Sequence, residues 1–135
     1  MKCKKSLYRF ITLCAATLAL AACGGGEGSS PPPPGAAATV SFSTQVQPIF
    51  TANCTINCHS PGGIAGFLNL TTGNSFASLL LSTPPRVIAG SSASSLLYRR
   101  ITGVVLPQMP LDLPPLSAAD QTLIKNWIDQ GAANN

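Results

Sequence analysis

Apolar residues recur at helical spacing in a few short stretches of the chain, and no alternating apolar and polar pattern typical of strands persists anywhere. A first helix is predicted by four apolar residues at helical spacing: Phe42, Val46, Ile49 and Phe50. This helix leads into Cys54. Pro48 fits it only in the first turn, because proline has no N–H to donate in a helix interior.

The last helix has the clearest signals. Ser117 and Asp120 stand three residues apart, as in a capping box, in which side chains satisfy the free N–H groups of the first turn. An apolar stripe follows: Leu123, Ile124, Trp127 and Ile128. Gly131 ends the pattern, so we expect one helix with one buried face.

Between these helices the chain is dominated by loop-forming residues. Residues 60–90 are rich in Gly, Pro, Ser and Thr and predict loops around one short helix at 76–81. A further helix is predicted at 94–101, stopped by Gly103. We therefore expect an all-α domain at 40–135, mostly helical with long Pro/Gly-rich loops. A domain of about 95 residues with so much loop is marginal, and a large apolar cofactor would supply much of the missing core.

The first 22 residues are typical of an export signal. A basic start is followed by thirteen uncharged residues, 10–22, which are too few for a bilayer span of about 20 residues. Leu20-Ala21-Ala22-Cys23 resembles a bacterial lipobox, so we expect removal of residues 1–22 and lipidation of Cys23. A plain cleaved signal and an uncleaved anchor are the alternatives.

Residues 23–39 then form a Gly/Ser/Pro-rich tether without apolar periodicity. We expect it to hold the domain off a membrane in the cell envelope, on the periplasmic or outer-membrane/surface face. The formal net charge of +4 belongs to the signal, because the remaining four basic residues equal the four acidic ones. Without a basic patch, nucleic-acid binding is not expected.

Processing also leaves two cysteines. Cys3 and Cys14 leave with the signal and lipid takes Cys23, so Cys54 and Cys58 remain as a pair. In an oxidising compartment such a pair is cross-linked, metal-bound or attached to a cofactor. The only histidine, His59, follows at once in CTINCH, which resembles the haem attachment sequence C-x-x-C-H with one additional residue.

Covalent haem attachment requires two thiols and an imidazole on one side of the backbone. In C-x-x-C-H one helical turn provides this, whereas the spacing here would turn His59 roughly 140° from Cys54 in a regular helix. The intervening Thr55-Ile56-Asn57 relieves the conflict, because β-branched residues weaken the helix and asparagine tolerates left-handed backbone. We therefore expect a local bulge that absorbs the extra residue.

Three other interpretations stay open. Cys54 and Cys58 could form a disulfide beside a surface His59. The trio could bind zinc, although structural zinc takes four such ligands and three remain here. A thiol-exchange site is the third, although the βαβ context of such sites is missing.

Met109, the only methionine beyond the initiator, is the candidate second axial ligand. A lone methionine is usually core filler. Pro107 and Pro110 bracket this one and exclude helix and strand, and 50 residues separate it from His59, enough chain to return to the opposite haem face. His/Met ligation raises the potential of haem iron and suits electron transfer.

The chain resembles small monohaem c-type cytochrome modules of the class I type, particularly those of bacterial lipoproteins and planctomycete-type proteins. The segments that carry the resemblance are VQPIFTANC, CH-SPGG with GFLNL, RVIAGSSASSLLYRRITG, QMP and LSAADQTLIKNWIDQGA. It implies one covalent haem c attached to Cys54 and Cys58, with His59 as proximal and Met109 as distal ligand. It also implies that the first and last helices cross, with Trp127 against Phe50 or Val46. The spacing of the two cysteines, with three intervening residues, departs from the family pattern by one residue.

These features predict a lipid-anchored electron carrier that serves redox partner proteins and performs no bond chemistry of its own. Arg86 is a candidate for a haem propionate, with a solvated arginine as the alternative. The main rival is a haem-free, disulfide-stapled envelope lipoprotein that acts as a binding module. A haem enzyme such as a peroxidase is a third possibility, disfavoured because no second histidine is available to break a peroxide bond.

Overall fold

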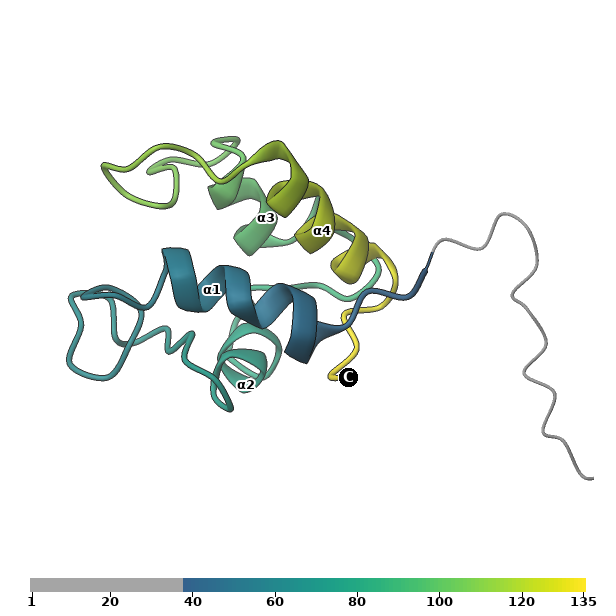
Figure 1. Cartoon of the computed structure of the whole chain (residues 1–135), viewed down its shortest axis with the longest axis horizontal. Coiled ribbons are helices and arrows are strands. Elements are labelled where there is room, and N and C mark those ends of the chain that lie inside the picture. Colours follow the sequence, from purple (N-terminus) through teal and green to yellow (C-terminus); the bar gives the residue numbers. More distant parts are fainter. Residues whose placement is uncertain (1–37) are drawn as a thin grey trace, which may run out of the picture. The chain divides into compact units, whose positions relative to one another are not determined.

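A computed structural model describes residues 38–135. Its regular elements are a π-helical turn and four α-helices: η1 (Phe42–Val46), α1 (Gln47–Asn53), α2 (Ser75–Leu80), α3 (Leu96–Ile101) and α4 (Ala118–Asp129) (Figure 1). The described residues contain no strand, which agrees with the expected all-α fold, but helix covers 37% of them. The domain is therefore less helical than expected, and loops make up most of it.

The predicted signal at 1–22, the predicted lipidation site Cys23 and nearly all of the tether at 23–39 lie outside the described residues. Among the helices of the described part, none combines the length and the apolar character needed to cross a membrane.

The predicted first helix is confirmed, but it begins with a wider turn. Ser41 caps it, because its hydroxyl accepts the N–H of Thr44 at 3.3 Å. The N–H of Val46 then reaches back five residues to the carbonyl of Ser41, at 3.3 Å, in the π-helical pattern. Pro48 follows in the first turn of α1, where its missing N–H is tolerated.

The predicted capping of the last helix is confirmed as well. The Ser117 hydroxyl accepts the N–H of Asp120 at 3.1 Å and donates to its carboxylate at 2.8 Å. Gly131, with a φ of +104°, lies just after the helix. The two short helices α2 and α3 lie within two residues of the predicted ranges, and Gly103 after α3 has a φ of +75°.

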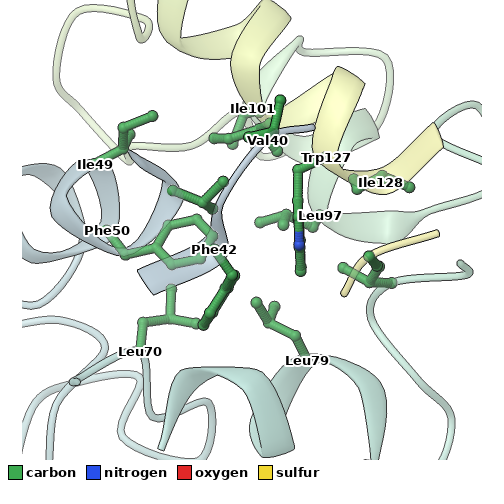
Figure 2. Close-up of a cluster of buried hydrophobic side chains, with 14 of the residues drawn as sticks. Val40, Phe42, Ile49, Phe50, Leu70, Leu79, Leu97, Ile101, Trp127 and Ile128 are labelled. Carbon is green, nitrogen blue, oxygen red and sulfur yellow. The ribbon is translucent and has the colours of Figure 1, made fainter. Parts of the chain in front are cut away.

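The core lies where α4 meets the first helix (Figure 2). Trp127 is almost fully buried, and its ring lies 4.9 Å from that of Phe42 between centroids. Phe42 in turn makes edge contacts with Phe50, at 6.3 Å, and Phe76, at 5.7 Å. The aromatic partner of Trp127 is thus Phe42, four residues before Val46 and eight before Phe50, the partners that the resemblance implied.

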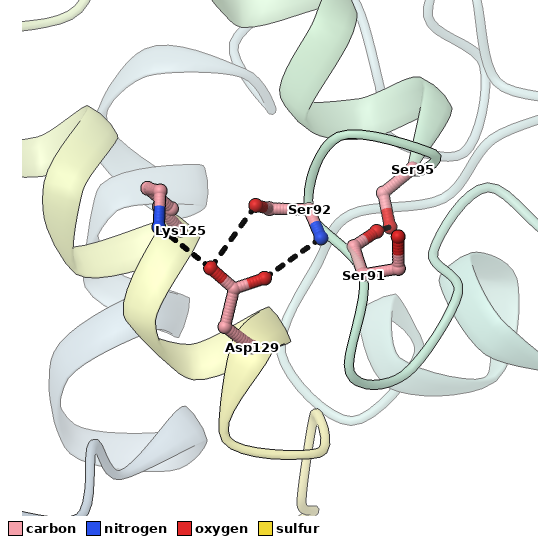
Figure 3. A network of polar contacts seen from close by, with 5 residues as sticks. All are labelled: Ser91, Ser92, Ser95, Lys125 and Asp129. Atoms are coloured by element: carbon pink, nitrogen blue, oxygen red, sulfur yellow. Dashed lines mark hydrogen bonds and ion pairs between the residues drawn. The ribbon is translucent and has the colours of Figure 1, made fainter.

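A polar network joins α4 to the loop before α3 (Figure 3). Asp129 accepts the N–H of Ser92 at 2.8 Å, the Ser92 hydroxyl at 3.1 Å and the Lys125 ammonium at 2.7 Å. The buried Ser95 hydroxyl donates to the carbonyl of Ser91 at 2.8 Å. These bonds fix the start of α3, which carries part of the candidate site.

Candidate cofactor site

A cavity of about 630 Å³ opens beside α1 and α3. All four predicted haem-binding residues line it: Cys54, Cys58, His59 and Met109. Cofactor pockets in proteins are roughly 300–1,000 Å³, so this cavity has room for a large organic group. In Figure 1 the loop that follows α1 and the loop that follows α3 extend from the same end of the domain.

The backbone of CTINCH is not helical. The helix ends at Asn53, and Asn57 has a φ of +58°, in the left-handed region. The N–H of His59 then bonds to the carbonyl of Cys54 at 2.9 Å, closing a turn one residue longer than an α-helical turn. The predicted bulge is confirmed, and it lets both thiols and the imidazole line one cavity.

The backbone of His59 is held on both sides while its ring is not. Its carbonyl accepts the N–H of Leu70 at 2.8 Å. Leu70 is anchored in turn by the buried Gln47, whose side-chain amide donates to the Leu70 carbonyl at 3.0 Å and also bonds to Ser75. His59 Nδ1 is the one buried side-chain nitrogen or oxygen without a hydrogen-bond partner in the described part of the chain.

An orphaned buried nitrogen of this kind costs free energy and calls for an explanation. A metal bound at Nδ1 would occupy this nitrogen, whereas a metal bound at Nε2 would leave Nδ1 as a donor without an acceptor. By its chemistry, the donor set of two thiols, an imidazole and a thioether fits a haem: the two thiols would hold it by thioether bonds, and the imidazole and the thioether would bind its iron.

The two cysteines are free thiols in the structure. Burial, and secondly the neighbouring Cys58, raise the pKa of the Cys54 thiol to about 11. Cys54 is therefore protonated at neutral pH. Thiol-exchange sites depend instead on a lowered thiol pKa, so the electrostatics of Cys54 do not favour that interpretation.

The loop after His59 folds back on the CTINCH turn. The N–H groups of Ile64 and Ala65 donate to the carbonyls of Asn57, at 3.2 Å, and Cys58, at 3.1 Å. Gly63 lies so close to Cys58 that a Cβ at this position would overlap the Cys58 carbonyl. Glycine here is thus required by close backbone approach.

Met109 reaches the cavity from an irregular loop, as predicted from its flanking prolines. It is half-buried and packs against the core. Its N–H donates to the carbonyl of Arg100 at 3.0 Å, which ties the loop to the last turn of α3. The structure thus brings Met109 to the same cavity as His59, 50 residues earlier in the chain.

The mouth of the cavity is apolar and exposed. Nine large hydrophobic residues of the described part are exposed, and five of them line this cavity: Ile56, Ile64, Phe67, Leu111 and Leu113. Phe67 and Ile64 are 84% and 83% exposed. Apolar surface gathered in this way marks a binding site. A cofactor within these loops was expected from the sequence, but the exposed apolar residues at the mouth were not predicted, because they lie in loops without helical periodicity.

Two arginines, Arg86 and Arg100, line the cavity, and no aspartate or glutamate does. This charge favours a ligand with anionic groups. Arg86 was a candidate from the sequence, whereas Arg100 was missed because its position depends on the path of the later loop. Among the described residues, no three His, Cys, Asp or Glu side chains form a group that could hold a metal ion by themselves.

Comparison of the chain with protein-family models, with curated proteins and with solved structures gave no match.

Proposed function

We propose that this protein is a monohaem c-type cytochrome that carries single electrons in the cell envelope. Cys54 and Cys58 hold the haem by thioether bonds, and His59 and Met109 bind its iron. The observation that carries the proposal is that these four residues, from two separate loops, line one cavity. The sequence contains no other histidine and no other methionine beyond the initiator, so no second constellation of this kind competes for the role.

The surroundings of the four residues fit such a group. The cavity volume of about 630 Å³ and its apolar mouth suit a planar apolar ring, and the two arginines suit its acidic substituents. When bound, haem supplies a one-electron redox couple. The residues of the chain hold the ring, exclude water with their apolar side chains and set the potential through an imidazole and a thioether.

The direct test is expression together with cytochrome c maturation factors, followed by a reduced-minus-oxidised spectrum. We expect visible absorption that survives acid-acetone extraction and a protein mass increased by one haem. Cys54→Ala and Cys58→Ala each remove one attachment point, and Met109→Ala is expected to abolish the sulfur-to-iron charge-transfer band of the oxidised protein. Colourless protein with a Cys54–Cys58 disulfide and an ordinary peptide mass would overturn the proposal in favour of the binding-module lipoprotein.

We also propose that a lipid on Cys23 anchors the domain. This proposal is based on the lipobox-like sequence before Cys23 and on the tether that follows it. Metabolic labelling with a fatty acid tests this. We expect label on the wild type and none on Cys23→Ser, and an unlabelled wild type would refute the anchor without touching the haem proposal.

A further inference from the structure

We propose that Arg100 is a positioning residue that clamps the Met109 loop to the end of α3 and so holds the Met109 side chain at the cavity. The inference rests on the proposed function where it concerns iron, because Met109 matters there as a ligand. The clamp itself is a property of the chain and is measurable without haem.

One half of the clamp is the backbone of Arg100. The last carbonyls of a helix have no partner within the helix. The carbonyl of Arg100, in the last turn of α3, accepts the N–H of Met109 at 3.0 Å. The helix end therefore fixes the main chain of Met109 itself.

The other half is the guanidinium group. Its Nη1 donates to the carbonyl of Pro107 at 3.1 Å. A single residue thus binds the loop on both sides of Gln108. Because Arg100, Pro107 and Met109 all line the cavity, the clamp lies directly at the site.

The loop has few other attachments. Two further hydrogen bonds join it to the rest of the domain, from the Val105 N–H to the Arg99 carbonyl at 3.0 Å and from the Gln108 amide to the Ile101 carbonyl at 3.3 Å. In the described structure, all hydrogen bonds from residues 105–113 to other segments end on residues 99–101. Loosening Arg100 therefore loosens the loop.

The adjacent Arg99 provides a matched control. It lies on the same helix, carries the same charge and is also half-buried, but its side chain does not line the cavity. Arg100→Gln removes the charge and the reach to Pro107, whereas Arg100→Lys keeps the charge with a shorter side chain. Because the lysine ammonium can still donate a hydrogen bond, the comparison shows how much a charged donor at this position contributes.

The first measurement is amide hydrogen exchange of residues 104–113 in the full chain, made with and without haem. The hydrogen bond from Arg100 to Pro107 is exposed to solvent, so its loss is expected to speed exchange about three- to tenfold, as for an ordinary hydrogen bond. We expect this in Arg100→Gln, a smaller effect in Arg100→Lys and no change in Arg99→Gln. Equal exchange in wild type and Arg100→Gln, or an equal increase in Arg99→Gln, would overturn the clamp.

The second measurement uses the haem-loaded protein and imidazole as a competing iron ligand. If Met109 leaves the iron more often, the apparent affinity for imidazole rises by the same factor as the loop loosens. We expect about three- to tenfold for Arg100→Gln, with a weaker sulfur-to-iron band. An Arg100→Gln protein that matches wild type in imidazole affinity and in the sulfur-to-iron band would overturn the clamp. If haem never attaches, the proposed function fails while the exchange data still decide the clamp.

Discussion

At the scale of single residues, Asn57 is what reconciles the CTINCH spacing with one shared cavity. A left-handed residue turns the chain sharply, and the N–H of His59 can then close on the carbonyl of Cys54. Asparagine adopts this conformation at lower cost than most residues, and a β-branched residue adopts it worst.

Replacing Asn57 tests this directly. Asn57→Val is expected to lower the free energy of unfolding by about 1–2 kcal/mol, the cost of left-handed backbone, and to reduce the yield of attached haem. Asn57→Gly keeps the conformation and serves as the control, with wild-type haem yield. Urea unfolding and the visible spectrum measure both effects. Wild-type behaviour of Asn57→Val would show that the turn does not require the left-handed residue.

A substitution at Gly63 is also expected to disturb haem attachment, but through a steric clash. In Gly63→Ala the new methyl group would overlap the Cys58 carbonyl, and forcing such an overlap costs about 1–3 kcal/mol. Gly62→Ala is the control, because its Cβ would meet no atom within 4 Å, although its φ of +80° still carries a backbone cost. We expect impaired thioether formation at Cys58 in Gly63→Ala alone, measured by mass spectrometry of haem peptides. Equal impairment in both variants would contradict the contact.

The Cys54 thiol offers a pH test in haem-free protein. Because burial and secondly Cys58 raise its pKa to about 11, the reactive thiolate is scarce at pH 8. In a Cys58→Ser variant, Cys54 is the only cysteine of residues 24–135, and burial, the larger cause of the raised pKa, remains. Alkylation of the Cys54 peptide by iodoacetamide should be slow at pH 8 and rise about tenfold per pH unit up to about pH 10. A rate already maximal at pH 8 would contradict a buried, protonated thiol.

At the scale of elements, the parts that the sequence predicted are those with local signals. The Ser117 cap, the Gly131 stop and the apolar stripe of α4 are contained in one short segment, so each could be identified without knowing the fold. The π-helical start of the first helix was not predicted. Its apolar spacing does not show whether each N–H bonds to the carbonyl four residues back, as in an α-helix, or five residues back, as in a π-helix. The Arg100 clamp was missed for a related reason, since it joins two segments whose approach is decided by the loop between them.

The link between α4 and the loop before α3 is expected to be pH-dependent. The Lys125 ammonium and, to a lesser extent, Ser92 hold the pKa of Asp129 below its ordinary value, against the effect of burial. A carboxyl group with a depressed folded-state pKa stabilises the fold above its unfolded pKa of about 3.9, and this is lost as pH falls through the folded pKa. We expect wild type to lose more stability than Asp129→Asn between pH 5 and the acid limit, in urea titrations.

Asp112→Asn is the control for that titration, because Asp112 is exposed and takes no part in the network of Asp129. Parallel pH profiles for wild type and Asp129→Asn would show that this pairing does not contribute to stability. High salt is expected to reduce the difference, because the Lys125–Asp129 pair lies at the surface.

At the scale of the whole molecule, the aromatic cluster and the cavity differ in how closely they are packed, although both border the same hydrophobic core. The cluster around Trp127 is closed and well packed, with its largest side chains almost fully buried. The mouth of the cavity is formed by loops with exposed apolar residues, whereas buried helix residues such as Leu79 and Leu97 line its inner wall. Such a distribution is expected if the second half of the core is provided by a bound group, as the small size and loop content of the chain suggested.

Protein with and without haem should therefore differ in global stability and not only in colour. Haem-free Cys54→Ser/Cys58→Ser protein is expected to melt at least about 10 °C below the haem-loaded wild type, because apolar side chains such as Phe67 stay in water. It should also bind the dye ANS, which reports exposed apolar surface, whereas the loaded protein should not. The near-ultraviolet signal of Trp127 should persist in both, since the aromatic cluster lies apart from the cavity lining. Equal melting temperatures and equal dye binding would mean that the loops close without a cofactor. This result would contradict the claim that a bound group completes the hydrophobic core.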